Sequence, residues 1–242
     1  GKEIQKYTGE SQNTEAEIQK LQTLIAKGGR EMEIGQTAYH REASRLESLK
    51  NLTERYDGYG NSIRRVMEQK KNQPGIKGVV ADLIKVDKRY ETAIETALGG
   101  SIQNIVADNE NTAKTMISFL KKNRYGRATF LPLTSMAQNK KAMVNQEARK
   151  EPGVIGVASE LVQAEPEYQG MIHHLLGRTL VVDHMDHGIA ISKKYHYSIR
   201  MVTVEGDLLS PGGSLTGGAF KNSSNLLGRR REIEELESSV KA

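Results

Sequence analysis

The stretch "SPGGSLTGGAF" (residues 210–220) comes nearest to a chemical motif, because Gly212 and Gly217 have the spacing of a phosphate-binding loop. In such a loop a lysine and a hydroxyl residue follow the second glycine, to hold the phosphates and to bind magnesium. Here Gly218 and Ala219 follow instead, so the sequence does not support a nucleotide site. Two interpretations remain. The glycines allow a close backbone approach, including one to a strand of another chain, or they form a flexible surface loop.

Histidines offer the second kind of chemistry. "DHMDH" (residues 183–187) follows a predicted strand and places His184 close to His187, whereas the neighbours His173 and His174 point about 100° apart on a predicted helix. The chain has no cysteine and no H-E-x-x-H motif. The sequence therefore favours solvated polar residues at element ends, and it predicts no metal ligand, no cofactor and no catalytic residue.

Composition sets wider limits. The 242 residues suffice for one large domain or two small ones, and the absence of cysteine excludes disulfides and thiolate metal sites. No apolar run has the length of a membrane span, and no signal peptide is apparent. The formal charge of +5 permits nucleic-acid binding without requiring it. Aromatic residues make up only 5%, which is typical of long charged helices.

The two ends of the chain predict helical arms. From Ile4 to Tyr56, apolar residues recur at alternating steps of three and four, the repeat of a coiled-coil seam. Gly28 and Gly29 leave open whether this arm is one continuous helix. The pattern returns in "RRREIEELESSVKA" (residues 229–242). We expect antiparallel arms with Leu46, Leu49, Ile233 and Leu236 in one seam, and most of the longer arm without a partner in its own chain.

The middle of the chain contains a duplication. "GVVADLIKVDKRYETAIETALG" (from Gly78) and "GVASELVQAEPEYQGMIHHLLG" (from Gly156) share seven of 22 residues without a gap. The similarity continues with small deletions, which aligns Asp108 with Asp183 and Arg127 with Arg200. Each unit predicts the order helix, strand, helix, strand, at 88–98, 102–107, 110–122 and 127–131, and at 166–176, 179–182, 186–195 and 200–204. The duplication therefore predicts two similar α/β subdomains related by a pseudo-twofold axis.

This order of arm, duplicated block with a glycine cluster, and returning arm resembles the hinge region of bacterial structural maintenance of chromosomes (SMC) proteins. The resemblance is carried by "LTERYDGYGNSIRRVM", by residues 78–133, by "LVVDHMDHGIAI" and by "TVEGDLLSPGGSLTGG". It implies an α+β fold, the SMC hinge, with two pseudo-twofold-related α/β subdomains between antiparallel coiled-coil helices. The expected parts are an arm (1–57), subdomain I (58–134), a linker (135–153), subdomain II (154–228) and the second arm (229–242).

The resemblance also implies a function. Two hinges join head to head in a ring-shaped homodimer, each interface adding a strand between subdomains of different chains, with Gly212, Gly213, Gly217 and Gly218 at the interface. The chain is then a non-enzymatic module of a chromosome condensation and segregation protein in the cytoplasm, associated with the nucleoid. The ATPase heads, to which kleisin and accessory subunits bind, are absent from this chain.

Weak DNA binding near the arm junction, preferring single strands, is a further implication of the resemblance. Basic residues gather at Lys121, Lys122, Arg124 and Arg127 and again at Arg229, Arg230 and Arg231. In the DNA-binding interpretation these residues contact phosphates, and Tyr125 is near enough in sequence to stack a base. In the alternative interpretation they are only cations at a helix C-terminus and on a solvated face. The competing function is a module that primarily binds DNA and dimerises incidentally.

Overall fold

The computed structural model describes residues 1–54, 59–138, 144–220 and 226–242. These fall into two compact units, one of residues 1–50 with 235–242 and one of residues 51–234. The predicted boundaries near residues 57 and 58, and parts of the predicted linker and of the segment after the glycine cluster, lie outside the described residues.

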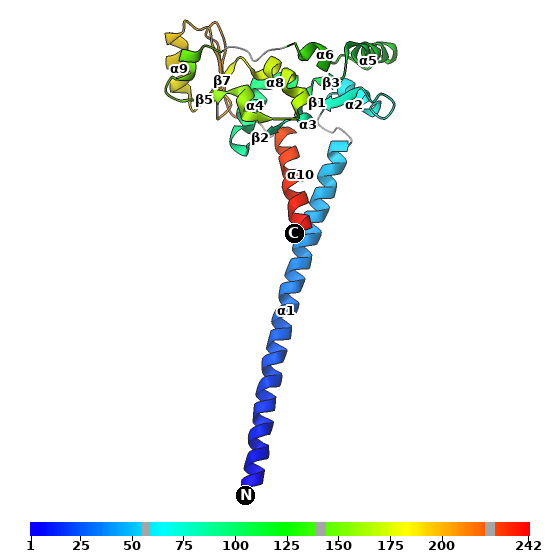
Figure 1. Cartoon of the computed structure of the whole chain (residues 1–242), viewed down its shortest axis with the longest axis vertical. Helices are drawn as coiled ribbons and strands as arrows, with labels where there is room; N and C mark the ends of the chain where they lie inside the picture. Colours follow the sequence, from blue (N-terminus) through cyan, green and yellow to red (C-terminus); the bar gives the residue numbers. More distant parts are fainter. Residues whose placement is uncertain (55–58, 139–143, 221–225) are drawn as a thin grey trace. The chain divides into compact units, whose positions relative to one another are not determined.

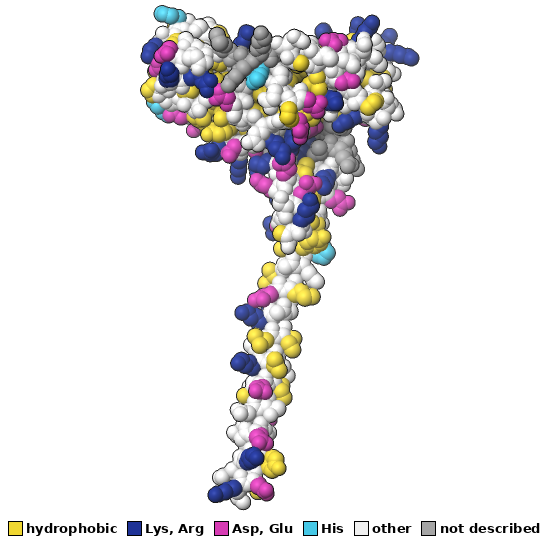
Figure 2. All heavy atoms as spheres, in the orientation of Figure 1, with side chains coloured by type: hydrophobic (Ala, Val, Ile, Leu, Met, Phe, Trp, Pro, Cys, Tyr) yellow, Lys and Arg dark blue, Asp and Glu magenta, His cyan; other side chains and the backbone are white. Residues whose placement is uncertain are grey.

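The first unit contains one unbroken helix, α1 (Lys2–Glu54), which answers the question left open by the sequence. Gly28 and Gly29 lie inside it, and a Cβ at either would meet nothing within 4 Å. Each glycine lowers the stability of a helix by about 1 kcal/mol relative to alanine. A long helix can accommodate this cost, because each further residue adds a backbone hydrogen bond. Large apolar side chains remain exposed along it, as the yellow side chains in Figure 2 show. Among the described residues, most of the arm therefore lacks a partner in its own chain, as predicted.

The second helix of this unit is the end of α10 (Leu226–Lys241), which lies beside α1 (Figure 1). The Lys50 ammonium lies 2.7 Å from the Glu237 carboxylate, and the Ser239 hydroxyl donates to Glu42. Position numbers rise along one helix as they fall along the other, so the pair is antiparallel. Leu46, Leu49 and Leu236 are half-buried, as expected of seam positions.

The second unit opens with a three-stranded sheet in the order β1-β3-β4. β1 pairs with β3 antiparallel, and β3 pairs with β4 parallel. The elements of this subdomain are α2 (Asn61–Glu68), β1 (Ile76–Val79), α3 (Val80–Leu83), β2 (Lys85–Val86), η1 (Lys88–Tyr90), α4 (Glu91–Leu98), η2 (Gly99–Gln103), β3 (Ile105–Ala107), α5 (Glu110–Asn123), β4 (Phe130–Pro132) and α6 (Leu133–Met136).

The second subdomain repeats this plan and extends it to five strands, in the order β10-β9-β8-β7-β5. Its β5–β7 pair is antiparallel and its β7–β8 pair parallel, like their counterparts. The elements are α7 (Gln146–Arg149), β5 (Val154–Val157), η3 (Ala158–Leu161), β6 (Val162–Gln163), η4 (Pro166–Tyr168), α8 (Gln169–Leu176), β7 (Thr179–Val182), α9 (Met185–Lys194), β8 (Arg200–Thr203), β9 (Leu208–Leu209) and β10 (Leu215–Thr216).

The predicted duplication is thus confirmed at the level of strand pairing. Even the register irregularity recurs, between Ile76 and Gly78 in one sheet and between Val154 and Gly156 in the other. The two short strands β2 and β6 pair antiparallel with each other. Because these strands are equivalent in the two repeats, their pairing lies where a pseudo-twofold axis would pass.

One detail of the sequence alignment was wrong. In the sheets, Phe130 lies opposite Ile105, and Met201 lies opposite Leu180. Ile105 and Leu180 are equivalent positions, since each lies three residues before the aligned aspartates Asp108 and Asp183. Phe130 therefore corresponds to Met201, which shifts the alignment of Arg127 with Arg200 by two residues. The matching arginines misled the alignment because β4 begins at Phe130, three residues later than the predicted strand.

Three apolar clusters hold the second unit together. A central one draws on both subdomains and on α10, and includes Ile94, Ile172 and Leu227. The other two belong to one subdomain each, around Met116 in the first and Met201 in the second. The shared central cluster ties the repeats to each other. Within the described ranges, no helix combines the length and apolarity needed to cross a bilayer.

Candidate interaction surfaces

The two sheets end differently, and the difference exposes two strand edges. In the second subdomain β8 pairs with β9, and β9 pairs with β10, the last strand of the sheet. In the first subdomain β4 takes the position of β8, but among the described residues its one hydrogen-bonded neighbour is β3. β4 and β10 thus each offer a free edge. Sequence analysis missed the β4 edge, since strand pairing is a non-local property.

The first two predicted glycines shape the turn before β10. The Gly213 amide donates to the Ser210 carbonyl at 3.0 Å, closing a four-residue turn with Pro211 second and Gly212 third. Gly212 has φ +91°, which a type II turn requires at its third position. Gly213 has φ +99° and lies against the Tyr197 ring. Both glycines therefore have a role inside the chain, whichever contacts they make outside it.

The other two predicted glycines follow β10. A Cβ at Gly217 would lie 2.4 Å from an Asp207 carboxylate oxygen, so this backbone passes close to a side chain of the same molecule. Gly218 has φ +131°, and a Cβ there would meet nothing within 4 Å. All four glycines are exposed. They place an exposed edge strand between two glycine pairs, and their predicted contact with a second chain stays a prediction.

Four of the predicted DNA-binding residues gather at and beyond the end of α5. Lys121 and Lys122 lie in its last turn, and Arg124 caps it in the left-handed conformation, φ 55°. These three and Arg127 are exposed. Within the described parts of the chain, none of the four forms an ion pair. They form one group of solvent-facing cations.

Tyr125 is adjacent in sequence to Arg124, and its ring already contacts other side chains of the chain. Its ring is half-buried, makes an edge contact with Phe119 at 5.6 Å, and has the Arg65 guanidinium 4.8 Å from its centre. The face that a base would stack on is therefore partly occupied, which weakens the stacking hypothesis for Tyr125.

The second predicted basic group is bound into the subdomain. Arg230 donates to the carbonyls of Asp82 and Ile84 at 2.6 and 2.8 Å. Arg231 lies 2.5 Å from the buried Glu91 carboxylate. Arg229 is half-buried. The first turns of α10 are thus attached to α3 and α4, and the structure gives these arginines different neighbours from the group on α5.

Asp82 is part of the same attachment. Its carboxylate accepts a hydrogen bond from the Tyr59 hydroxyl at 3.0 Å. Burial raises the pKa of Asp82, against the opposing effects of the Tyr59 hydrogen bond and the charges of Arg230 and Arg229. Burial likewise raises the pKa of Glu95, which accepts from the Leu227 amide at the start of α10.

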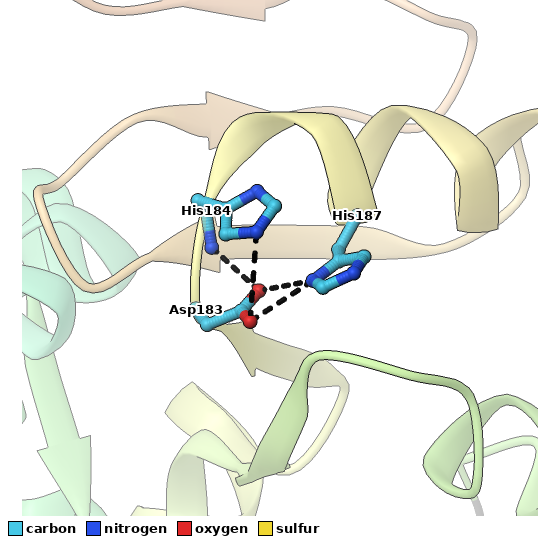
Figure 3. Close-up of side chains that lie close together, drawn as sticks. All are labelled: Asp183, His184 and His187. Carbon is cyan, nitrogen blue, oxygen red and sulfur yellow. Dashed lines mark hydrogen bonds and ion pairs between the residues drawn. The ribbon is translucent and has the colours of Figure 1, made fainter.

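The histidines of "DHMDH" come together around one carboxylate (Figure 3). His187 Nδ1 lies 2.8 and 2.9 Å from the two Asp183 oxygens, and His184 Nε2 lies 3.7 Å from Oδ2. The two imidazole rings stack with centroids 4.1 Å apart. The His187 hydrogen bond lowers the pKa of Asp183. The sequence places His184 close to His187 but favours solvated polar residues at an element end.

Known proteins share this architecture. Residues 73–192 match the family model described as the SMC proteins flexible hinge domain. The chain is 43% identical over 225 residues to the chromosome partition protein Smc of Desulfitobacterium hafniense, covering 91% of this chain and 19% of that protein. The chain thus spans less than a fifth of the length of that protein and of the Smc proteins of Lactiplantibacillus plantarum and Bacillus subtilis, which it also resembles.

Solved structures agree with the sequence relatives. The asymmetric dimer of the Geobacillus stearothermophilus SMC hinge domain is 38% identical with a TM-score of 0.77, over 85% of this chain and 83% of that one. The Pyrococcus furiosus SMC hinge domain is 30% identical with a TM-score of 0.54, over 77% of this chain and 96% of that one. With its duplicated sheets and its flanking arm helices, this chain belongs to the SMC hinge-domain family.

Proposed function

We propose that this chain is the homodimerisation hinge of a bacterial chromosome partition protein, and that β4 of one protomer pairs with β10 of its partner. The single observation that supports this is the mismatch between the sheets: β8 carries two further strands, and its counterpart β4 carries none among the described residues. A strand added to β4 would satisfy main-chain groups that the isolated chain leaves to water.

Symmetry makes this contact self-limiting. Each chain offers one β10 edge and one β4 edge, on different subdomains. Two chains related by a twofold axis can therefore form the contact twice and close a ring, leaving neither edge free. The relative from Geobacillus stearothermophilus is described as an asymmetric dimer, which supports dimerisation of this chain.

Leu215→Glu tests this assembly. Leu215 lies in the edge strand β10 and is 55% exposed in the single chain, so pairing with a partner would bury it and a carboxylate there would oppose association. We expect light scattering after size exclusion to give about twice the 26.8 kDa chain mass for the parent and the single mass for the variant at micromolar protein.

Ile117→Glu is the matched control, because Ile117 is an exposed apolar residue of α5, 39% accessible, that belongs to neither edge strand. It should remain dimeric. A dimeric Leu215→Glu, or a parent chain that is itself monomeric, would contradict the proposed interface.

We also propose a weaker DNA-binding role for the cations at the end of α5. Four exposed cations within seven residues, unpaired in the described parts of the chain, suit the phosphate backbone. Arg230 and Arg231 are left out of this proposal, since they already bind carbonyl and carboxylate groups.

Replacing Lys121, Lys122, Arg124 and Arg127 together by glutamate should weaken binding to all single-stranded DNA sequences alike, because phosphates carry no sequence information. For the parent, log affinity should fall against log salt with a slope of about −0.7 per phosphate contact. Fluorescence anisotropy measures both. A variant with Lys2, Lys6, Lys20 and Arg30 reversed makes the same change in net charge on the arm.

That arm variant should keep most of the affinity. If it loses as much as the α5 variant, binding follows net charge alone and the α5 group is only a solvated surface. The same salt series separates the two candidate functions: a dimer joined by strands persists at high salt, whereas phosphate contacts weaken steeply.

In a protein as long as the Smc relatives, the hinge dimer would join two arms whose distant ends carry ATPase heads. Kleisin and accessory subunits would bind at those heads, and the assembly would act on the nucleoid in the cytoplasm. These roles rest on the family to which the hinge belongs.

A further inference from the structure

The duplication supplies an internal control for the Asp183 cluster. Asp108 and Asp183 occupy equivalent positions, and each accepts a hydrogen bond from the next backbone amide, at 2.8 and 2.7 Å. Their amides donate to Gly75 and Gly153, which are also equivalent. The side chain four residues on bonds the carboxylate in both repeats, but it is Thr112 in the first and His187 in the second.

The residue after each aspartate also differs between the repeats, and again the second repeat has a histidine. In the first repeat Asn109 caps α5 by accepting from the Thr112 amide at 3.0 Å. In the second repeat His184 takes the cap position of α9, and its side chain makes no capping bond. A histidine pair thus replaces a residue pair that suits this turn better, so local helix capping does not explain the histidines.

The geometry points to a site for a divalent transition-metal ion of the zinc type, bound by Asp183, His184 and His187. One ligand atom from each lies within 4.8 Å of the other two. Ligands on a tetrahedral zinc are about 3.3–3.6 Å apart, given bonds of about 2.0–2.2 Å. The histidine side chains are 54% and 38% exposed, so small side-chain rotations close the remaining gap.

The donor set selects the class of ion. Two imidazoles and one carboxylate suit zinc and its neighbours in the transition series, whereas magnesium and calcium prefer oxygen ligands only. Three protein ligands leave at least one position for water. The site lies at the N-terminus of α9, where the partial positive charge of the helix dipole is unfavourable for a cation. The negative charges of Asp183 and of the exposed Asp186 in the first turn of α9 both offset this effect.

The backbone beneath the cluster holds it in place. Gly153 has φ +89°, and a Cβ there would lie 2.4 Å from His187 Nδ1 and 2.6 Å from Asp183 Oδ1. Only a glycine lets the chain pass this close. This glycine leaves room for the Asp183 carboxylate and the His187 ring, and both face the exposed His184 side chain (Figure 3).

Isothermal titration calorimetry with zinc chloride alone, on the full chain without a histidine tag, tests the site. We expect one zinc ion per chain. The variant His184→Asn/His187→Thr installs the residues of the first repeat, which already fit this backbone, so it should fold. It should lose at least tenfold in affinity, since even outer partners of metal ligands typically contribute about 10–100-fold.

His173→Ala/His174→Ala is the matched control, because it also removes two histidines of the second subdomain but leaves the cluster intact. It should bind zinc like the parent. The proposal is overturned if the parent takes up no zinc at millimolar concentration, or if His184→Asn/His187→Thr binds it as tightly as the parent. Loss of zinc binding in the control variant alone would equally overturn it.

Discussion

Arg231→Ala is expected to lower the free energy of unfolding of the hinge by about 3–5 kcal/mol. Glu91, the carboxylate 2.5 Å from the Arg231 guanidinium, is only 4% exposed. Removing the arginine takes away a charge that compensates a buried carboxylate, and this loss costs far more than a surface ion pair is worth. Urea denaturation followed by circular dichroism measures the change.

Two further variants separate this effect from a general loss of charge. Lys150→Ala removes the partner of Glu147 in a pair whose side chains are 75% and 76% exposed, and should cost only about 0–1 kcal/mol. Glu91→Gln/Arg231→Met removes both charges of the pair and should recover much of the stability lost in Arg231→Ala. If Arg231→Ala unfolds within 1 kcal/mol of the parent, the pair does not attach α10 to α4.

The Arg231 ion pair also shows where sequence reasoning fell short. Three adjacent arginines look alike in the sequence, and only the fold reveals that Arg230 and Arg231 point at carbonyl and carboxylate groups about 140–150 residues earlier. The Asp82 and Glu91 partners carry no local signal for this role. Periodicity identifies elements, but contacts between distant elements depend on packing that no window of sequence contains.

The regular elements were far more predictable. Helices 110–122 and 186–195 agree with α5 and α9 within one residue at each end, because the apolar spacing of both helices and the Asn109 cap of α5 are local signals. Strand 179–182 agrees with β7, which is buried throughout. Strand 102–107 was too long, since residues 99–103, which begin with a glycine pair, form a 3₁₀ helix, and short strands offer little periodicity to set their start.

The candidate sites, too, were predictable only in their local features. The glycine cluster was found because its composition is unusual, yet the type II turn at Gly212 and the free edge of β4 follow from pairing alone. For the Asp183 cluster, the spacing of "DHMDH" did place His184 near His187. What the sequence lacked was the comparison with Asn109 and Thr112, which requires the structural alignment of the repeats.

Gly170→Ala is expected to destabilise the hinge by about 3 kcal/mol, the upper part of the usual range for overpacking. Helix propensity alone predicts the opposite, because alanine inside a helix is favoured over glycine by about 1 kcal/mol. Gly170 lies in the first turn of α8, where a Cβ would be 2.2 Å from the Met136 carbonyl oxygen. That atom is backbone, so α6 or α8 must move as a whole.

Gly100→Ala serves as the comparison, since a Cβ there meets nothing within 4 Å and φ is not positive, and it should change stability by less than about 1 kcal/mol. Thermal and urea unfolding of both variants decide whether sterics or propensity governs position 170. A Gly170→Ala variant as stable as the parent would mean that α6 is free to move away from α8. The equivalent residue of the first repeat is Thr92. The duplication alone would therefore suggest that a side chain fits at 170, and the close approach of α6 is where the second subdomain departs from the symmetry of the first.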